Sequence, residues 1–237
     1  MTSSKQVKLN FPQTLAYGLS NFHIHAGVRD IFDGLAAVLV GDTECKPWII
    51  EGAERFGKTH LLIALQQLVE REGKRSLLLT FDDLQGFSQG VDWNEVLSGI
   101  NVCLIDDFDW LLDEVVAWNK ISIVVDLFET CKQQSKKLVM SSRRSIVDYT
   151  DLDPHARSRI SAATWLELGK PAEEDCRVIL ELLAKQRGLK FSERQVNFLC
   201  RRLRQDIASV ERYLTRLISW SEVAGEPIKL SNIAEIL

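Results

Sequence analysis

Apolar residues follow two patterns along most of the chain, short unbroken runs and longer stretches with a helical period. The run Trp48-Ile49-Ile50 has the length of a buried strand, whereas Val28 to Val40 carries its apolar residues at helical spacing. Further strands are predicted at Ser76 to Phe81, Asn101 to Ile105, Lys137 to Met140 and Thr164 to Leu168, and further helices at Leu61 to Val69 and Ile121 to Cys131. This alternation predicts an α/β fold, a parallel sheet with helices on both faces.

The pattern changes at Gly169, after which only helical periods remain. Helices are predicted at Ala172 to Arg187, Glu193 to Arg204, Ile207 to Val223 and Ser231 to Leu237. We therefore expect an α/β domain over residues 13–168 and a small all-helical lid domain over residues 169–237.

Residues 1–12 form a third segment, in which apolar and polar residues alternate from Gln6 to Phe11, before Pro12. Val7, Leu9 and Phe11 would lie on one side of an extended peptide, as in flexible ends that anchor in the apolar pockets of a partner. An edge strand or a frayed terminus is the alternative explanation. The pattern alone leaves both open.

A glycine-rich stretch lies between the first predicted strand of the α/β domain and the helix that follows. It matches G-x-x-x-x-G-K-[ST], in which glycines let backbone N–H groups surround phosphate oxygens. Lys58 adds a positive charge, the Thr59 hydroxyl can hold Mg²⁺, and the helix adds its N-terminal dipole. The predicted nucleotide-binding residues are Gly52, Ala53, Glu54, Arg55, Phe56, Gly57, Lys58, Thr59 and His60.

The predicted strand Asn101 to Ile105 ends in two acids, Asp106 and Asp107. In phosphate-loop proteins an acid at this place holds Mg²⁺, and a neighbouring carboxylate can orient the attacking water. We therefore expect Asp106 to serve the metal together with Thr59, and Asp107 to orient the water. Without the phosphate loop, two acids after a strand would indicate only a loop.

Composition excludes few classes of protein. The chain has 237 residues, of which 46% are hydrophobic and 26% charged, enough for one large domain or a domain with an appendage. No apolar run approaches the roughly 18 to 20 residues of a membrane span, and the first residues lack a secretory pattern. Five cysteines without a C-x-x-C pair favour reduced thiols. These features predict a cytoplasmic protein without a membrane partner.

The net charge of −4 argues against a chain dominated by nucleic-acid affinity. Its distribution is uneven, because Lys185 to Arg216 holds nine basic residues against three acidic ones. This basic lid face is explained by a solvated helix surface, by DNA, or by an acidic protein partner.

Several motifs together resemble the AAA+ ATPases, and within them the DnaA group. These are the loop continuing as Thr59-His60-Leu61-Leu62, the pair Asp106-Asp107, the strand end Ser141-Ser142-Arg143-Arg144, and Arg157-Ser158-Arg159 before the lid. The resemblance covers nearly the whole chain, and it implies an AAA+ phosphate-loop sheet followed by a helical lid.

A DnaA-like core that lacks a helix-turn-helix domain and begins with a Gln6-x-x-Leu9-x-Phe11 peptide is similar to the Hda family, the regulatory inactivators of DnaA. That similarity implies that Gln6, Leu9 and Phe11 dock on the DNA-polymerase sliding clamp. It also implies DnaA as a partner, whose bound ATP is hydrolysed so that replication does not re-initiate. A self-sufficient ATPase such as a helicase loader is the main alternative, and a small-molecule kinase is a weaker one.

The resemblance also assigns roles to arginines and polar residues. Arg159 corresponds to the arginine finger that enters a neighbour's nucleotide site, and Ser142, Arg143, Arg204 and Gln205 are sensor candidates. The chain departs from DnaA in three places.

Arg143 stands where DnaA commonly has aspartate, Gln205 falls where a lid arginine is expected, and His155 replaces a usual arginine. We therefore expect weak ATP turnover by this chain itself, with ADP or another nucleoside diphosphate and Mg²⁺ as its ligands. The number of copies that assemble is left open.

Overall fold

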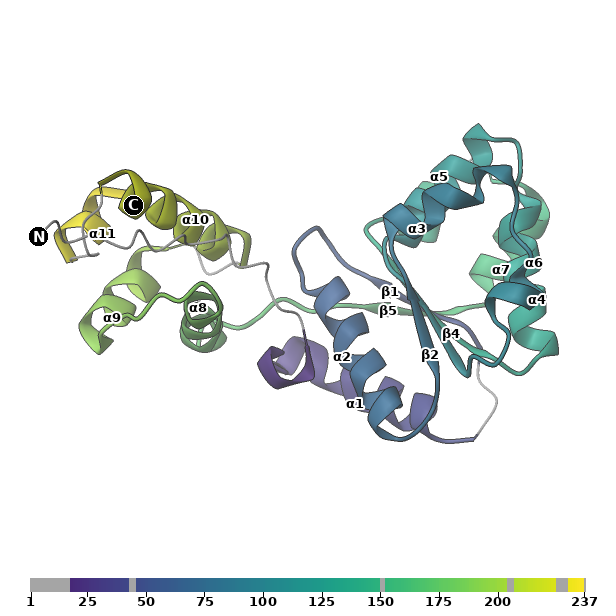
Figure 1. Cartoon of the computed structure of the whole chain (residues 1–237), viewed down its shortest axis with the longest axis horizontal. Helices are drawn as coiled ribbons and strands as arrows, with labels where there is room; N and C mark the ends of the chain where they lie inside the picture. Colours follow the sequence, from purple (N-terminus) through teal and green to yellow (C-terminus); the bar gives the residue numbers. More distant parts are fainter. Residues whose placement is uncertain (1–17, 43–45, 150–151, 204–206, 225–229, 237) are drawn as a thin grey trace, which may run out of the picture. The chain divides into compact units, whose positions relative to one another are not determined.

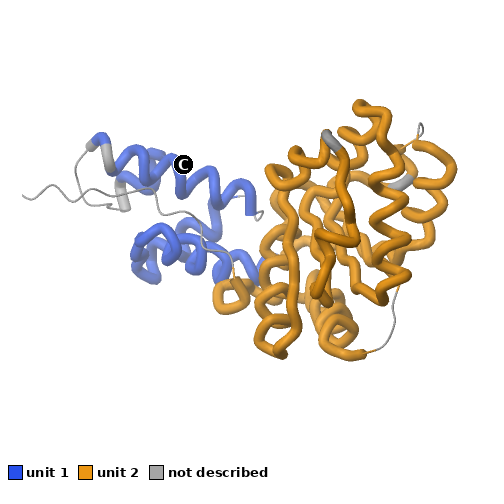
Figure 2. Tube along the Cα trace, turned by 45° about the vertical axis from the view of Figure 1, so that its right-hand side comes forward, with its two compact units in different colours: residues 1–17, 173–237 blue, residues 18–172 orange. Residues whose placement is uncertain are grey.

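The computed structural model describes residues 18–42, 46–149, 152–203, 207–224 and 230–236. The chain divides into two compact units, and Figure 2 draws them in different colours. One is Gly18–Ala172, and the other contains Glu173–Leu237 together with residues 1–17, which lie outside the described part. Each unit has an apolar core of its own.

In the described part of the first unit, five strands form one sheet in the order β2-β3-β4-β1-β5, and all neighbouring strands run parallel. The strands are β1 (Trp48–Glu51), β2 (Ser76–Leu79), β3 (Val102–Ile105), β4 (Lys137–Ser142) and β5 (Thr164–Glu167). The parallel sheet predicted from the sequence is confirmed.

Helices cover both faces of this sheet, as Figure 1 shows. On one face lie α1 (Ala26–Val40) and α2 (Lys58–Arg71), and on the other α5 (Phe108–Ala117), α6 (Ser122–Gln133) and α7 (Pro154–Ser161). Strand residues alternate between the two cores, so that Ile49 belongs to one and Ile50 to the other. The remaining short elements are η1 (Leu19–Asn21), α3 (Phe81–Gln85), η2 (Gly86–Gln89), α4 (Trp93–Val96) and η3 (Ile146–Asp148).

The strand predicted over Ser76 to Phe81 is shorter in the structure, because β2 ends at Leu79. Thr80 then caps α3, since its backbone N–H and its hydroxyl both donate to an Asp83 carboxylate oxygen, at 2.8 and 2.7 Å. This capping box begins a helix at Phe81, which the sequence predicts as the last residue of the strand.

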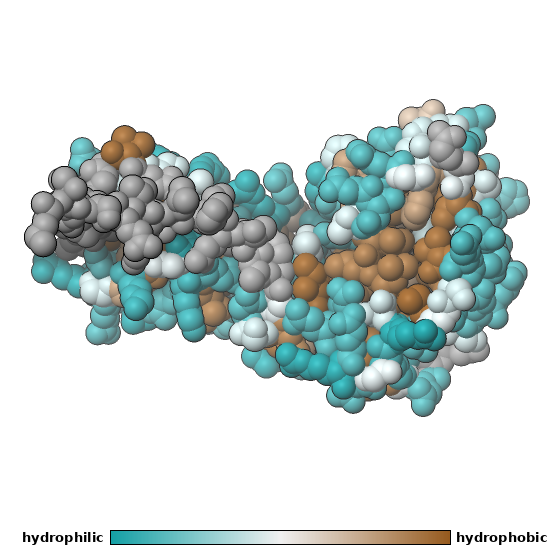
Figure 3. Space-filling view, in the orientation of Figure 1, coloured by the Kyte–Doolittle hydropathy of each residue, from teal (hydrophilic) through white to brown (hydrophobic). Residues whose placement is uncertain are grey.

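Strand β2 lies at an edge of the sheet, where its side chains are only partly covered. Leu77 and Leu78 are half-buried, unlike the fully buried β3. Figure 3 shows apolar surface over β2, bordered by hydrophilic residues. The first unit is therefore only partly covered along this edge.

The second unit is helical in its described part. It contains α8 (Asp175–Gln186), α9 (Glu193–Arg202), α10 (Ile207–Ala224) and α11 (Leu230–Ile236), which pack around a core that includes Leu180, Leu199, Leu214 and Ile233. The Tyr213 hydroxyl donates to the Ile233 carbonyl oxygen at 3.1 Å and ties α10 to α11. No helix among the described residues is long and apolar enough to cross a membrane.

Candidate nucleotide site

The phosphate-loop motif forms a turn between β1 and α2. Gly52 follows the strand, and its N–H donates to the Ser142 carbonyl oxygen of β4 at 3.1 Å. Gly57 caps α2 in the left-handed conformation, with φ of 88°, which glycine adopts without steric cost. Arg55 is also left-handed, with φ of 64°. The loop thus has the strand–turn–helix context that its motif requires.

Lys58 is buried beneath this loop, with a relative exposure of 6%. Its ammonium donates to the carbonyl oxygens of Gly52 at 2.7 Å and Ala53 at 3.0 Å. Burial lowers the pKa of Lys58, and the charges of Asp107 and Asp106 oppose that shift. A buried ammonium at the centre of a phosphate loop is suited to bind an anionic phosphate.

The expected metal residues lie together although they are far apart in sequence. The Thr59 hydroxyl donates to Asp106 Oδ2 at 2.6 Å, and the Ser141 hydroxyl donates to Asp106 Oδ1 at 2.5 Å. Oxygen ligands of this kind fit Mg²⁺, which is commonly held by one or two protein groups and by phosphate oxygens. When bound, the ion would neutralise charge that develops on the phosphates.

Asp107 adjoins this pair at the start of α5. Its backbone is left-handed, with φ of 49°, and its N–H donates to the Ser141 hydroxyl oxygen at 2.8 Å. Burial and the neighbouring charge of Asp106 raise the pKa of Asp107, while Arg143 opposes that shift. Ser141 therefore fixes both acids, a role that the sequence prediction missed although Ser141 lies in one of its motifs.

The sensor candidates on β4 and after it point to different partners. Ser142 is buried, and its hydroxyl donates to the Arg144 carbonyl oxygen at 2.7 Å within the turn. Arg143 Nε donates to Asp109 Oδ2 at 3.0 Å and lies 3.8 Å from Asp107 Oδ1. Asp109 is 1% exposed, and the sequence prediction did not single it out.

Other residues of the motif lie around the loop or on α2. Glu54 and Arg55 form an exposed ion pair at 3.6 Å, and the Lys170 ammonium lies 5.7 Å from the centre of the Phe56 ring. His60 contacts the segment before α1 instead of the loop: its Nε2 lies 3.0 Å from Asn21 Oδ1. His60 thus holds the beginning of the described chain against α2.

Arg159 lies in the last turn of α7. Asp153 caps this helix, since its Oδ1 accepts the His155 N–H at 2.8 Å. Arg159 forms a two-nitrogen ion pair with Glu129 of α6, at 2.6 Å from Nε and 2.5 Å from the terminal nitrogen. Its side chain is 42% exposed, whereas Arg157 donates to the Tyr149 carbonyl oxygen of its own unit. The Arg159 guanidinium is therefore within reach of a partner molecule.

The remaining predicted site residues lie outside the described part of the chain. These are Arg204 and Gln205 among the sensor candidates, and the expected clamp-binding residues Gln6, Leu9 and Phe11.

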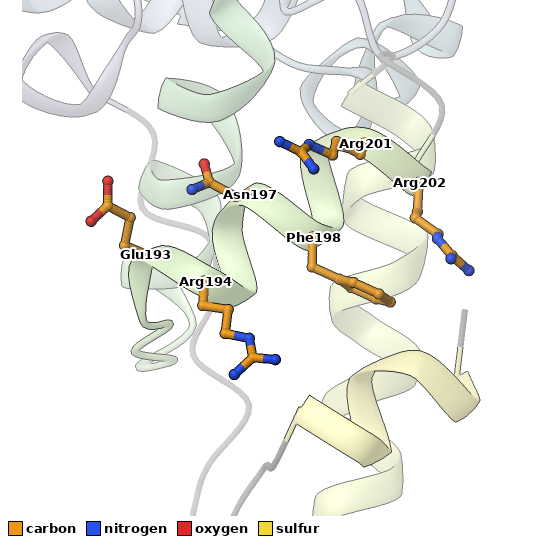
Figure 4. Close-up of a pocket in the computed structure, with 6 residues that line it drawn as sticks. All are labelled: Glu193, Arg194, Asn197, Phe198, Arg201 and Arg202. Carbon is orange, nitrogen blue, oxygen red and sulfur yellow. The ribbon is translucent and has the colours of Figure 1, made fainter.

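A hollow of about 590 Å³ lies along α9 in the helical unit. Figure 4 shows its side chains projecting from this one helix. The Arg202 guanidinium lies over the Phe198 ring, with 5.1 Å from the guanidinium carbon to the ring centre. Glu193 forms an ion pair with Arg177 of α8, with 3.8 Å between Glu193 Oε1 and a terminal guanidinium nitrogen of Arg177. The lining residues are Glu193, Arg194, Asn197, Phe198, Arg201 and Arg202. The basic face predicted for the lid is thus partly gathered in one groove.

The family model of the bacterial DnaA ATPase domain matches residues 13–166. The chain belongs to this family. Strand β4 and the loop of the DnaA-like domain both fall within the match, as does Arg159. The match confirms the DnaA-group resemblance of the sequence motifs.

Solved structures agree on the fold of this DnaA-like chain. Domain III of the Thermotoga maritima replication initiation protein DnaA is 20% identical, with a TM-score of 0.77, and the match covers 96% of this chain and 98% of that one. An AMPPCP-bound DnaA from Aquifex aeolicus is 18% identical, with a TM-score of 0.67 over 90% of this chain and 66% of that one. A Thermotoga maritima RuvB structure is 17% identical, with a TM-score of 0.61 over 94% and 71%. The AAA+ fold class is therefore confirmed.

Proposed function

We propose that this chain is an Hda-like regulator, which binds a nucleotide and promotes the hydrolysis of ATP bound to DnaA. The observation that carries the proposal is the partly exposed Arg159 at the end of α7, in a chain of the DnaA ATPase-domain family. An arginine supplied in trans can stabilise charge on a transferred phosphoryl group. The outcome would be DnaA bound to ADP and a block on re-initiation of replication.

The ion pair with Glu129 is compatible with this role. Both partners are partly exposed, and exposed pairs contribute only about 0 to 1 kcal/mol. Arg159 can therefore leave Glu129 for a phosphate at little cost, and the ion pair holds the guanidinium until then.

The nucleotide proposed for this chain's own loop is ADP or another nucleoside diphosphate, with Mg²⁺ between Thr59 and Asp106. The buried Lys58 and the 2.6 Å contact of Thr59 with Asp106 support it, as does the AMPPCP bound by the Aquifex aeolicus DnaA. Hydrolysis of ATP by this chain itself would be weak. The bound nucleotide would therefore serve mainly to stabilise one conformation of the protein.

Two further parts of the chain complete the proposal. Residues 1–12, through Gln6, Leu9 and Phe11, would dock on the DNA-polymerase sliding clamp, and residues 169–237 would act as the lid domain of residues 13–168. The protein would work in the cytoplasm, on clamp that is loaded on DNA.

We place DNA against the groove on α9. Arg194, Arg201 and Arg202 line this groove together with Phe198, and arginines beside an aromatic ring suit a nucleic-acid backbone and its bases. Changing the three arginines to alanine should weaken DNA binding and flatten its salt dependence, by about 0.7 to 0.9 in the logarithmic slope for each lost phosphate contact.

Fluorescence anisotropy with a labelled oligonucleotide measures this slope. The double variant Arg212→Ala/Arg216→Ala, which removes exposed arginines of α10, serves as the matched control and should keep the original slope. If the groove variant binds DNA normally but loses affinity for DnaA, the groove is a protein-binding surface.

Reconstitution tests the function itself and separates it from that of a helicase loader. Purified DnaA with labelled ATP, clamp loaded on DNA and this chain should together produce DnaA-ADP, and omission of either clamp or chain should stop the reaction. A self-sufficient ATPase would instead turn over ATP without clamp and leave DnaA-bound ATP intact.

A further inference from the structure

Arg143 is held at both its backbone and its side chain by one buried carboxylate. Its backbone N–H donates to Asp109 Oδ1 at 3.2 Å, and its Nε donates to Asp109 Oδ2 at 3.0 Å. The Asp109 side chain is 2% exposed, so this charge has little access to water. A buried carboxylate that accepts two bonds from one residue fixes that residue's position.

The guanidinium fixed in this way faces the candidate water-orienting acid. Arg143 Nε lies 3.8 Å from Asp107 Oδ1, and its guanidinium carbon lies 4.9 Å from the centre of the Trp110 ring. Asp107 itself is held by its N–H bond to the Ser141 hydroxyl oxygen at 2.8 Å. The Arg143 side chain and the Asp107 backbone are therefore both held in place.

The neighbouring arginine, Arg144, contacts Asp109 only at that residue's backbone carbonyl oxygen, at 3.4 Å, and has another carboxylate as its ion-pair partner. Arg144 pairs with Asp113, one turn further along α5, and its guanidinium carbon lies 4.4 Å from the centre of the Tyr149 ring. Arg144 thus ties the strand end to α5 without facing Asp107. This difference provides a control for any effect of removing positive charge from the turn.

We propose that Asp109 positions Arg143 as a fixed counter-ion to Asp107, and that this pair restrains hydrolysis of nucleotide bound to the chain's own phosphate loop. A carboxylate polarises a water less effectively when a fixed positive charge lies beside it. Arg143 places a positive charge 3.8 Å from the Asp107 carboxylate and so makes it less able to polarise a water, and the hydrogen bonds of Asp109 hold that charge in place. The inference rests on the proposed nucleotide site and explains why its own turnover would be weak.

A different role for Arg143 predicts the opposite outcome. An arginine at a phosphate site can bind the terminal phosphate directly, and its removal would then weaken ATP binding and slow hydrolysis. As a counter-ion to Asp107, its removal leaves ATP binding nearly unchanged and accelerates hydrolysis. The two roles are therefore distinguished by measuring affinity and rate on the same variants.

The test uses the full chain and the double variant Arg143→Gln/Asp109→Asn, because Arg143→Gln alone would leave a buried carboxylate without its partner. Calorimetry measures the affinities for ADP and ATP. A single-turnover assay with labelled ATP measures the hydrolysis rate, and thermal melting shows whether each variant is folded. We expect hydrolysis to rise about tenfold, which is below the usual range of general-base catalysis, with affinities changed less than about twofold.

Two further variants make the result specific. Adding Asp107→Asn to the double variant should abolish the gain, and Arg144→Gln/Asp113→Asn should produce none. An unchanged or slower rate in a folded double variant, or a loss of ATP affinity of about tenfold, would overturn the inference. If the unaltered chain fails to bind ADP at all, the proposed nucleotide site is wrong, and this inference is wrong with it.

Discussion

At the scale of single residues, the candidate site depends on a few polar contacts beneath the phosphate loop. Among these residues, Lys58 has the charge that would contact a phosphate most directly. Its ammonium donates to two carbonyl oxygens of the loop. Those bonds keep the buried ammonium satisfied and point it into the turn. Binding of a phosphate would therefore exchange neutral acceptors for a charged one.

We predict that Lys58→Ala weakens ADP binding by about 1.5 to 3 kcal/mol, the usual scale for a charge-assisted hydrogen bond. Calorimetry would record this as a rise in Kd of about 10- to 150-fold. Lys74→Ala is the matched control, because Lys74 follows the opposite end of α2 and pairs with Asp42. Unchanged ADP affinity in Lys58→Ala would remove the loop from nucleotide binding.

Sequence patterns identify the individual chemical groups of the site better than their contacts. The motif spacing gives Lys58, Thr59 and Asp106, and the structure places the last two 2.6 Å apart. The pair of Asp109 with Arg143 joins residues that are 34 positions apart, and it depends on the neighbouring register of β3 and β4. No local pattern encodes such a pairing, so it becomes visible only in the folded chain.

At the scale of elements, the strands and longer helices follow directly from apolar periodicity. Capping determines the ends that periodicity misses: Thr80 and Asp83 begin α3 where a strand residue was expected. The helix α5 was not predicted, because its apolar residues directly follow the Asp106-Asp107 pair and a left-handed turn at Asp107 separates it from β3. A single left-handed residue cannot be recognised from hydropathy.

The helix that carries Arg159 offers a test at this scale. Asp153 caps α7 by accepting the N–H groups of His155 at 2.8 Å and Ala156 at 3.4 Å, and Pro154 occupies its first turn. We predict that Asp153→Ala lowers the free energy of unfolding by about 0.5 to 2 kcal/mol. Urea denaturation measures the loss.

Asp153→Asn is the control for this prediction, since asparagine is an equally good cap. The asparagine variant should therefore retain most of the stability that alanine removes. Equal destabilisation by both variants would show that the carboxylate charge, and not the cap, stabilises the helix.

At the scale of the whole molecule, we propose that different parts of the chain bind different partners: the phosphate loop binds a nucleotide, and residues 1–12 bind the sliding clamp. Leu9 and Phe11 lie outside the described residues, so the clamp-docking role of residues 1–12 stays a prediction. Leu9→Ala/Phe11→Ala should abolish clamp binding, because two apolar side chains contribute about 3 to 6 kcal/mol when buried. Surface plasmon resonance with immobilised clamp measures the loss.

Lys8→Ala/Asn10→Ala is the matched control, because these residues would face the opposite side of an extended peptide. The control should bind clamp with little change. Undiminished binding by Leu9→Ala/Phe11→Ala would return this segment to an edge strand or a terminus without a partner.

Arg159→Ala in the reconstituted assay with clamp loaded on DNA shows whether the chain acts on DnaA through Arg159. We predict that hydrolysis of DnaA-bound ATP falls by about 10³-fold or more, the scale of a lost arginine finger. Arg159→Lys should rescue little, since an ammonium lacks the planar fork of a guanidinium. Melting temperature, ADP affinity and clamp binding should be unchanged. A stable variant with full activity, or one whose activity falls only in parallel with its stability, would contradict the account.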